Sequence, residues 1–225
     1  TFSDGRTGAR IETRLLVKKA SGWAALPYVW QADGQAVLKR AGARMPVSVE
    51  GRPIDWQVPN VNQCKGCHAV GDTLMPIGPK ARNLTPESLA ALRAAGLLDG
   101  PAPGMPLPRF DDAGGASVEA RARAYLDVNC GHCHAPRGPA SNSGLFLTWE
   151  TADPTARGIG KRPVAAGRGT GGHDLDIDPG HPERSILLYR MQSTETGIAM
   201  PELGRTLVHD EAVALVRVYI AGLKQ

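Results

Sequence analysis

The chain has 225 residues, enough for one large or two small domains, and its 27 glycines, 18 prolines and 5% aromatic residues indicate a turn-rich chain with a thin core. Its net charge of +4 is spread without a basic block, which excludes the footprint of a nucleic-acid-binding protein. No run approaches the roughly 18 apolar residues of a membrane-spanning helix, and neither a signal segment nor a lipidation motif opens the chain at Thr1, so we expect a soluble protein without a transmembrane segment.

Residues 1–58 are predicted to form a small β-rich module. Strand-like stretches at Ile11–Val17, Trp23–Trp30 and Met45–Val49 are separated by glycines, and Pro27 interrupts the second of them. Because these residues contain no pattern of metal ligands, we expect this module to hold no cofactor.

Residues 59–115 form a second predicted segment, which contains a Cys-x-x-Cys-His sequence and one helix. Thr85 is suited to cap that helix, Pro86 occupies its first position, and Gly96 ends it. The segment is small for an independent domain, so we expect it to depend on contacts with its neighbours.

Residues 116–225 form a third segment, which contains a second Cys-x-x-Cys-His sequence between helices. Ser117 is suited to cap a helix that runs into Cys130, and a last helix is predicted over Asp210–Ala221. Between these helices we expect two strands and a short helix, at Leu145–Trp149, Asp174–Asp178 and Glu183–Met191 respectively.

All four cysteines fall within these two Cys-x-x-Cys-His motifs. The motif is typical of haem c attachment, in which two thiols add to the vinyl groups of one porphyrin and the adjacent histidine ligates the iron. This composition would give roughly 0.002 such motifs by chance, so two copies predict two covalently bound haems c. The residues expected to bind them are Cys64, Cys67, His68, Cys130, Cys133 and His134, with His68 and His134 as iron ligands.

Other uses of paired cysteines fit this sequence less well. A disulfide framework would leave His68 and His134 without a role. A zinc ribbon uses two closely spaced Cys-x-x-Cys pairs, whereas 62 residues separate Cys67 from Cys130. A thioredoxin-like redox pair requires a βαβ context that the pattern lacks.

A methionine thioether in the sixth position of haem iron raises the potential and closes the site to small ligands. For the second haem the candidate is Met200, which precedes Pro201 just before the last helix. For the first haem the preferred candidate is Met105, which follows the predicted helix, over Met75, which lies soon after His68. The remaining alternatives for the first haem are an open site or one of His173, His181 and His209.

Three smaller features have plain interpretations. His132, inside the second motif, is expected to point away from the iron of that motif. The alternating aspartates of 174–178 lack the glycine and glutamate of a calcium loop, so we expect a solvated strand face. The glycine-rich loop 167–172 lacks the ending of a phosphate-binding loop, and a position near a haem propionate, with Arg168 as its partner, is the alternative.

The order of features in 116–225 resembles the class I cytochrome c fold: a helix, the cysteine motif, a Gly/Pro loop, Met-Pro and a closing helix with an aromatic residue. This resemblance implies that the first and last helices cross and bring Ala122 and Leu126 against Tyr219. The whole chain resembles bacterial periplasmic dihaem c-type cytochromes with an N-terminal β module. The stretches that carry this second resemblance are Ile11–Val17, Pro27–Trp30, Pro76–Leu84 and Arg121–Cys130.

The predicted fold is therefore α+β: a β-rich module (1–58) followed by two mainly α-helical, cytochrome c-like haem lobes (59–115 and 116–225), the second with a β insertion. We expect a periplasmic dihaem cytochrome that transfers electrons between donor and acceptor proteins, an electron carrier rather than an enzyme. Two alternatives remain. One is a dihaem peroxidase, in which one haem has an open or displaceable sixth position, and the other is the cytochrome subunit of a larger dehydrogenase, docked through residues 1–58.

Overall fold

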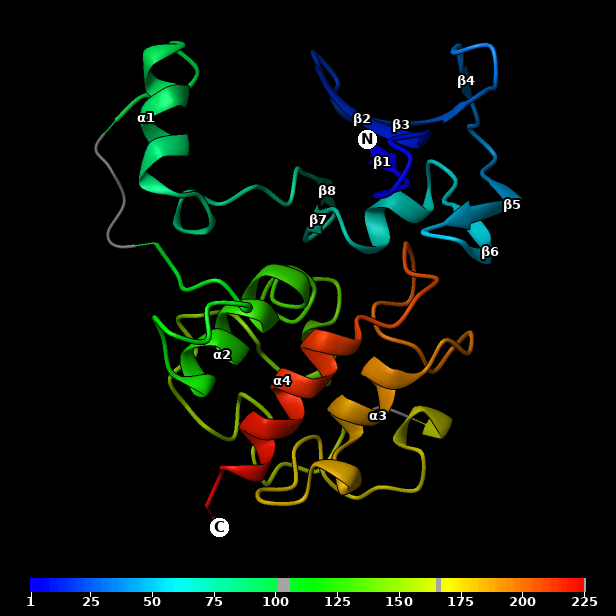
Figure 1. The fold of residues 1–225 in the computed structure, drawn as a ribbon. Coiled ribbons are helices and arrows are strands. Elements are labelled where there is room, and N and C mark those ends of the chain that lie inside the picture. The colour runs from blue at the N-terminus through cyan, green and yellow to red at the C-terminus, as the bar shows by residue number, and fades with distance from the viewer. Residues whose placement is uncertain (101–105, 165–166, 225) are drawn as a thin grey trace.

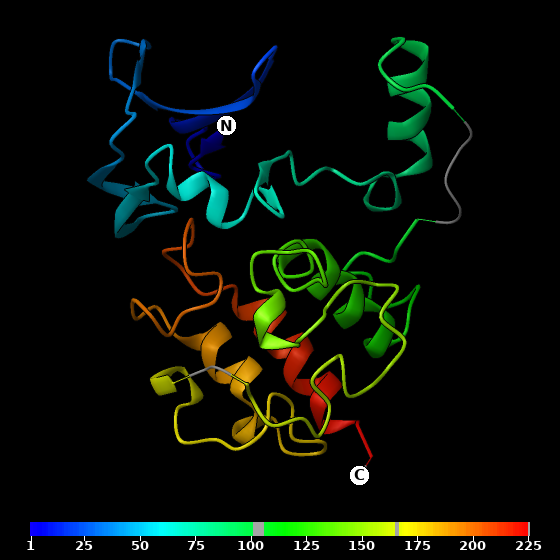
Figure 2. The same ribbon diagram turned by 180° about the vertical axis from the view of Figure 1, so that it is seen from behind.

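The computed structural model describes residues 1–100, 106–164 and 167–224 and contains both helices and strands, which confirms the α+β class. The strands gather in the N-terminal part of the chain, and most of the helices gather in the C-terminal part (Figures 1 and 2). Among the described residues, no helix combines the length and the hydrophobicity that crossing a membrane requires.

The N-terminal part consists of a four-stranded antiparallel sheet followed by a β-hairpin. The three predicted strand-like stretches are confirmed as strands, but the expected interruption at Pro27 is wrong, because β3 runs through this residue, which pairs with Arg14 of the neighbouring strand. Further strands lie beside them. In the hairpin, Glu50 and Gly51 both have positive φ angles, as a tight two-residue turn between twisted strands requires. The sheet contains β1 (Phe2–Ser3), β2 (Arg10–Lys19), β3 (Gly22–Trp30) and β4 (Ala36–Leu38), and the hairpin contains β5 (Ala43–Val49) and β6 (Arg52–Val58).

Glu12 joins the sheet to the hairpin. Its carboxylate is fully buried and accepts hydrogen bonds from Arg14 Nε (2.7 Å) and from Trp56 Nε1 of β6 (2.9 Å). Both partners are donors, so the buried charge is satisfied and the two strand layers are held together.

The segment after the hairpin contains little regular structure besides one α-helix. Helix α1 (Pro86–Ala94) begins at Thr85, whose hydroxyl accepts a hydrogen bond from the Ser88 N–H (3.2 Å), which confirms the predicted cap. Leu89 is the one buried residue of α1, which the structure describes in full, and the helix stands apart from the sheet in Figure 1. The shorter elements are the 3₁₀ turns η1 (Gln63–Gly66) and η2 (Ala81–Asn83) and the strands β7 (Ala69–Val70) and β8 (Thr73–Leu74), which form a hairpin.

The C-terminal part is built around helices that share one core. Helix α2 begins at Ser117, whose hydroxyl accepts a hydrogen bond from the Ala120 N–H (3.2 Å), as predicted. Ala122 and Leu126 of α2 and Tyr219 of α4 belong to the same buried cluster, and α2 packs against α4. The helices are α2 (Val118–Asn129), α3 (Ile186–Gln192) and α4 (Asp210–Ala221), with 3₁₀ turns η3 (Ser141–Ser143), η4 (Gly167–Thr170) and η5 (Pro182–Arg184).

The predicted strands at Leu145–Trp149 and Asp174–Asp178 are wrong. Neither segment pairs with a continuous partner, because their backbone groups bond to separate loops. The Leu147 N–H donates to the carbonyl of His134 (2.9 Å), and the region of the aspartates makes only isolated bridges, at Leu175 and Ile177. Alternating polarity in the sequence therefore reflects packing around loops here and not a sheet.

The predicted solvated face of aspartates is also wrong for two of its three members. Asp176 and Asp178 are buried, and only Asp174 is exposed. Asp176 pairs with Lys161 (2.9 Å) and Asp178 pairs with Arg184 (3.0 Å). Carboxylates are buried when cations from elsewhere in the fold satisfy them, and the local pattern does not show those partners.

Asp127 of α2 holds the first cysteine-containing segment to the C-terminal part. Its carboxylate is fully buried and accepts hydrogen bonds from Lys80 Nζ (3.1 Å), from Arg82 Nη2 (2.7 Å) and from the Trp149 N–H (3.0 Å). Lys80 and Arg82 lie in the segment after the hairpin, so a single buried anion joins parts of the chain that are far apart in sequence.

We expect Asp127 to make the folded state sensitive to acid. Burial raises the pKa of Asp127, but hydrogen bonds from Arg82, the Trp149 N–H and Lys80 outweigh burial and hold that pKa below its ordinary value. Because the folded pKa is the lower one, the stabilisation is complete above about pH 4 and is lost as the pH falls through the folded pKa. Urea denaturation at a series of pH values should show this loss in the wild type and a weaker pH dependence in Asp127→Asn. Equal dependence in both proteins would contradict the assignment.

Candidate functional site

A cavity of about 520 Å³ lies in the C-terminal part and is lined by residues from both cysteine motifs. Cys130, Cys133 and His134 of the second motif line it together with Met200, which is 66 residues further along the chain. Much of the remaining lining is aliphatic, including Leu145. With Cys67 of the first motif, the structure thus brings five of the predicted haem-binding residues to one largely apolar site.

The second motif directly follows α2, and its local geometry fixes His134. The Cys130 N–H donates to the Leu126 carbonyl (2.9 Å), and the His134 N–H donates to the Cys130 carbonyl (2.9 Å), so the motif continues the turn of the helix. His134 Nδ1 lies 3.2 Å from the Leu145 carbonyl, which can only accept, so Nδ1 carries the proton and Nε2 is left as a lone-pair donor. A hydrogen bond to Nδ1 of this kind orients a metal-binding histidine.

A second layer of polar contacts supports His134. Ser143 Oγ lies 3.4 Å from His134 Nδ1, and the Ser143 carbonyl accepts a hydrogen bond from Lys161 Nζ (3.0 Å). Lys161 in turn pairs with the buried Asp176. Burial lowers the pKa of His134, so this imidazole is neutral near pH 7, the form that ligates metals.

Helix α3 positions Met200 at the same cavity. The Met200 N–H donates to the Arg190 carbonyl (3.1 Å), and Arg190 Nε donates to the Ile198 carbonyl (2.8 Å). Arg190 therefore holds the loop of Met200 with both its backbone and its side chain. Sequence reasoning missed this role, and the one available signal is a single arginine in a short helix whose buried residues are all apolar.

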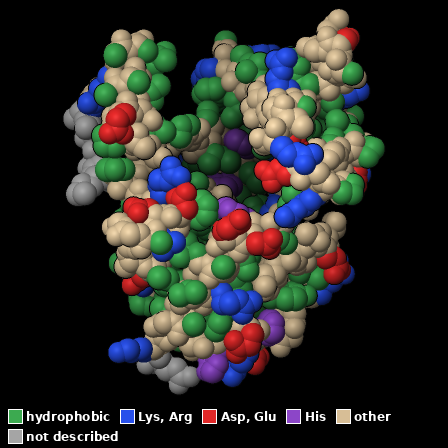
Figure 3. All heavy atoms as spheres, viewed as in Figure 1, with side chains coloured by type: hydrophobic (Ala, Val, Ile, Leu, Met, Phe, Trp, Pro, Cys, Tyr) green, Lys and Arg blue, Asp and Glu red, His purple; other side chains and the backbone are tan. Residues whose placement is uncertain are grey.

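The imidazole of the first motif, unlike that of His134, has an unpaired Nδ1 within the described part of the chain. The His68 N–H donates to the Cys64 carbonyl (2.8 Å), so this motif forms the same kind of turn as the second one. His68 Nδ1 is buried and has no hydrogen-bond partner among the described residues, and burial lowers the pKa of this imidazole. Figure 3, which has the same view as Figure 1, shows a hollow between α1 and the β-rich part of the molecule. Hydrophobic and histidine side chains lie inside this hollow.

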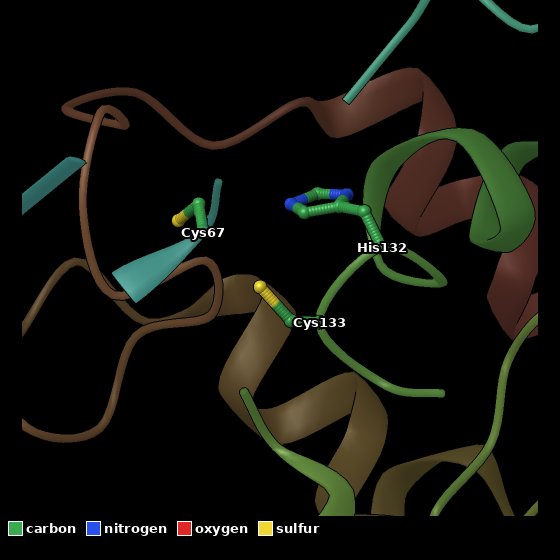
Figure 4. A group of neighbouring side chains, drawn as sticks. All are labelled: Cys67, His132 and Cys133. Atoms are coloured by element: carbon green, nitrogen blue, oxygen red, sulfur yellow. The ribbon is translucent and has the colours of Figure 1, made fainter. Parts of the chain in front are cut away.

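The two motifs meet at three side chains, Cys67, His132 and Cys133. Their ligand atoms all lie within 4.8 Å of one another, and the His132 ring points toward Cys67 (Figure 4). Hydrogen bonds from Cys133 and His132 lower the pKa of Cys67 to about 4, whereas the same bond to Cys67 raises the pKa of Cys133. Sequence reasoning kept the motifs apart and gave no sign of this contact.

Two glycines, one within the second motif and one just after it, have no room for a side chain. A Cβ added to Gly131 would lie 2.8 Å from the carbonyl oxygen of Asp127, and one added to Gly138 would lie 2.2 Å from that of Cys133. The backbone there approaches closely enough that only glycine fits.

The other candidates for the first iron lie away from this cavity or outside the described residues. Met105 lies outside the described residues. Met75 is 42% exposed, and its N–H donates to the His68 carbonyl (2.9 Å). The three lone histidines contact other side chains: His173 packs on Tyr189, His181 lies near Glu183, and His209 lies 3.2 Å from the Tyr125 hydroxyl.

Arg168, in the glycine-rich loop, does not line the cavity. It donates to the Thr196 carbonyl (2.8 Å) and pairs with Glu195 (3.0 Å), and its side chain is largely exposed. Arg190 does line the cavity. Of the two arginines it is therefore the better placed to pair with an anion bound there.

The residues at the cavity fit a haem c on their donor chemistry. His134 has a fixed Nδ1 and a free Nε2, Met200 offers a thioether, and Cys130 and Cys133 offer free thiols. At the first motif, the unpaired buried Nδ1 of His68 shows a polar group that the described protein atoms do not satisfy. Comparisons of the chain with protein-family models, curated proteins and solved structures found no match.

Proposed function

We propose that this chain is a dihaem c-type cytochrome that carries electrons between partner proteins in the periplasm. The observation that supports it most is the single cavity of about 520 Å³ that gathers Cys130, Cys133, His134 and Met200. Two thiols, an imidazole and a thioether are the groups that attach and coordinate haem c. Because the thioether comes from a distant part of the chain, the fold adds a ligand that the motif alone does not contain.

In the second site the residues bind, orient and shield the group. Cys130 and Cys133 would attach the haem through thioether bonds, His134 Nε2 would ligate the iron, and the Met200 thioether would supply a second iron ligand. When bound, haem supplies one-electron chemistry by cycling between ferric and ferrous iron. The hydrogen bond from His134 Nδ1 to Leu145 keeps the imidazole ring in one orientation in both states.

In the first site Cys64, Cys67 and His68 take the corresponding roles, and Met105 is proposed as the sixth ligand. Met75 is a poor alternative on geometry. Its N–H bonds to the His68 carbonyl, and β7 and β8 continue the pairing, so the two residues oppose each other across a hairpin. Opposed side chains begin about 5 Å apart, which leaves no room for a porphyrin between them.

The proposal includes the arrangement of lobes. Residues 1–58 form the cofactor-free module, 59–115 the first haem lobe and 116–225 the second, which is class I cytochrome c-like. In support, α2 packs against α4 with the predicted residues in their common core. Export to the periplasm is proposed because covalent haem attachment of this kind occurs outside the cytoplasm, where free thiols are otherwise oxidised.

The test of the proposal is the haem content of the purified chain. Haem stain should persist on denaturing gels, and a pyridine haemochrome assay should give about two haems per chain. The paired variants C64A/C67A and C130A/C133A should each retain one haem, and the matched surface variant His181→Ala should retain both. A chain that carries zinc and no haem, or that keeps both haems in a paired variant, would overturn the proposal.

A further inference from the structure

The contact between the two motifs is the least expected feature of the site. Cys67 belongs to the first motif, and His132 and Cys133 belong to the second, yet their ligand atoms lie within 4.8 Å of one another. Cys133 Sγ also lies 3.7 Å from the Gly66 carbonyl, so the two turns touch through backbone as well as side chains. All three side chains line the same cavity.

Of the three side chains in this contact, His132 is the one that haem attachment would not use. Thioether formation would use the sulfurs of Cys67 and Cys133, and it would leave His132 as the remaining ligand group of this contact. The Nδ1 atom of His132 is already buried with no hydrogen-bond partner among the described residues. An imidazole with a buried, unpaired Nδ1 beside two attachment points needs an explanation other than packing.

We propose that His132 is a positioning residue for a direct contact between the two haems, so that they act as one coupled pair and not as two independent carriers. This inference rests on the proposed function. Because the Cys67 and Cys133 sulfurs are neighbours, the porphyrin edges bonded to them are neighbours as well. The His132 imidazole lies beside both sulfurs, with its ring pointing toward Cys67, and from this position it would fix the spacing of the edges.

Coupling has two physical consequences. A short path between porphyrin edges favours electron exchange within the chain over exchange with partners. In addition, the charge state of one iron acts on the other through a poorly polarisable interior, where charges interact more strongly than in water. Reduction of the first haem should therefore shift the potential of the second.

The experiment uses the holoprotein and two spectroscopic readouts. Soret circular dichroism of the wild type should show a bisignate signal, which arises when two like chromophores lie close together. The signal should exceed the sum of the spectra of C64A/C67A and C130A/C133A. Electron paramagnetic resonance of the fully oxidised wild type should show lines broadened by spin–spin interaction that sharpen in the half-reduced state.

Variants of His132 test its own role. His132→Ala should retain both haems and lose most of the bisignate signal, and His132→Gln, which preserves much of the volume and polarity, should recover part of it. His209→Ala, a histidine outside the cavity, is the matched control and should leave the signal unchanged.

The outcomes separate this inference from the proposed function. Two bound haems with a Soret spectrum equal to the sum of the single-haem spectra, and no spin–spin broadening, would overturn the contact while leaving the cytochrome intact. An unchanged signal in His132→Ala would overturn the role of that residue. A haem-free chain that binds one zinc through Cys67, His132 and Cys133 would overturn the proposed function itself.

Discussion

Asp127→Ala is expected to lower the free energy of unfolding by roughly 3 kcal/mol, the low end of the range for breaking a buried ion pair. The carboxylate is fully buried, whereas Lys80 and Arg82 are 33% and 22% exposed, so water partly compensates the cations when the anion is removed. The Trp149 N–H would also lose its acceptor. Urea denaturation at neutral pH measures the change.

The matched control for this variant is Glu150→Ala. Glu150 pairs with the same Arg82 but is 62% exposed, so its removal should cost less than about 1 kcal/mol. If Asp127→Ala and Glu150→Ala destabilise the protein equally, the buried carboxylate does not hold the segments together as described.

Met200→Ala is expected to convert one haem from low-spin to high-spin and to lower its potential, while the other haem keeps its spectrum. Loss of the thioether opens the sixth position and removes the ligand that raises the potential. The loop should otherwise keep its place, because Arg190 binds the Ile198 carbonyl and the N–H of residue 200, and the substitution leaves both groups unchanged. Absorption, electron paramagnetic resonance and a spectroelectrochemical titration report the spin states and potentials.

Met105→Ala should have the converse effect on the first haem, and Met75→Ala is the control that should change neither. Met105 lies in a stretch with many prolines and glycines and no helical or strand periodicity, so we expect its iron–sulfur bond to open more readily than that of Met200. If Met200→Ala leaves both haems low-spin with unchanged potentials, the assignment of Met200 is wrong.

Local signals in the sequence were sufficient for much of the secondary structure. The caps at Thr85 and Ser117 and the helix at Asp210–Ala221 depend on neighbouring residues, and the structure confirms all three. The segments 145–149 and 174–178 were predicted wrongly because loops from elsewhere in the chain bond to their backbone. Short alternating patterns do not distinguish these two situations.

For the candidate site too, local sequence signals were sufficient for some residues and not for those that act through contacts elsewhere in the chain. The cysteine motifs were identified from spacing and Met200 from its ligand type and its position before the last helix, and the structure brings the second motif and Met200 to one cavity. The supports of that cavity, Arg190 and Lys161, were not predicted, because each acts through a backbone carbonyl distant in sequence. Apart from the lone arginine among the buried apolar residues of α3, no residue type or spacing marks such a contact in advance.

Because the backbone is tightly packed at Gly131, the two motifs tolerate different residues at their second position, both in protein engineering and in evolution. The first motif carries Lys65 where the second carries Gly131, and a Cβ at position 131 would collide with the Asp127 carbonyl. Transplanting the first motif into the second position would therefore distort the end of α2, next to the carboxylate that joins the segments. The reverse transplant meets no such backbone collision, because glycine fits where lysine does and a Cβ at position 66 would meet only the Leu203 side chain, at 3.9 Å. Sequence drift at these two sites is thus asymmetric, although both would perform the same attachment chemistry.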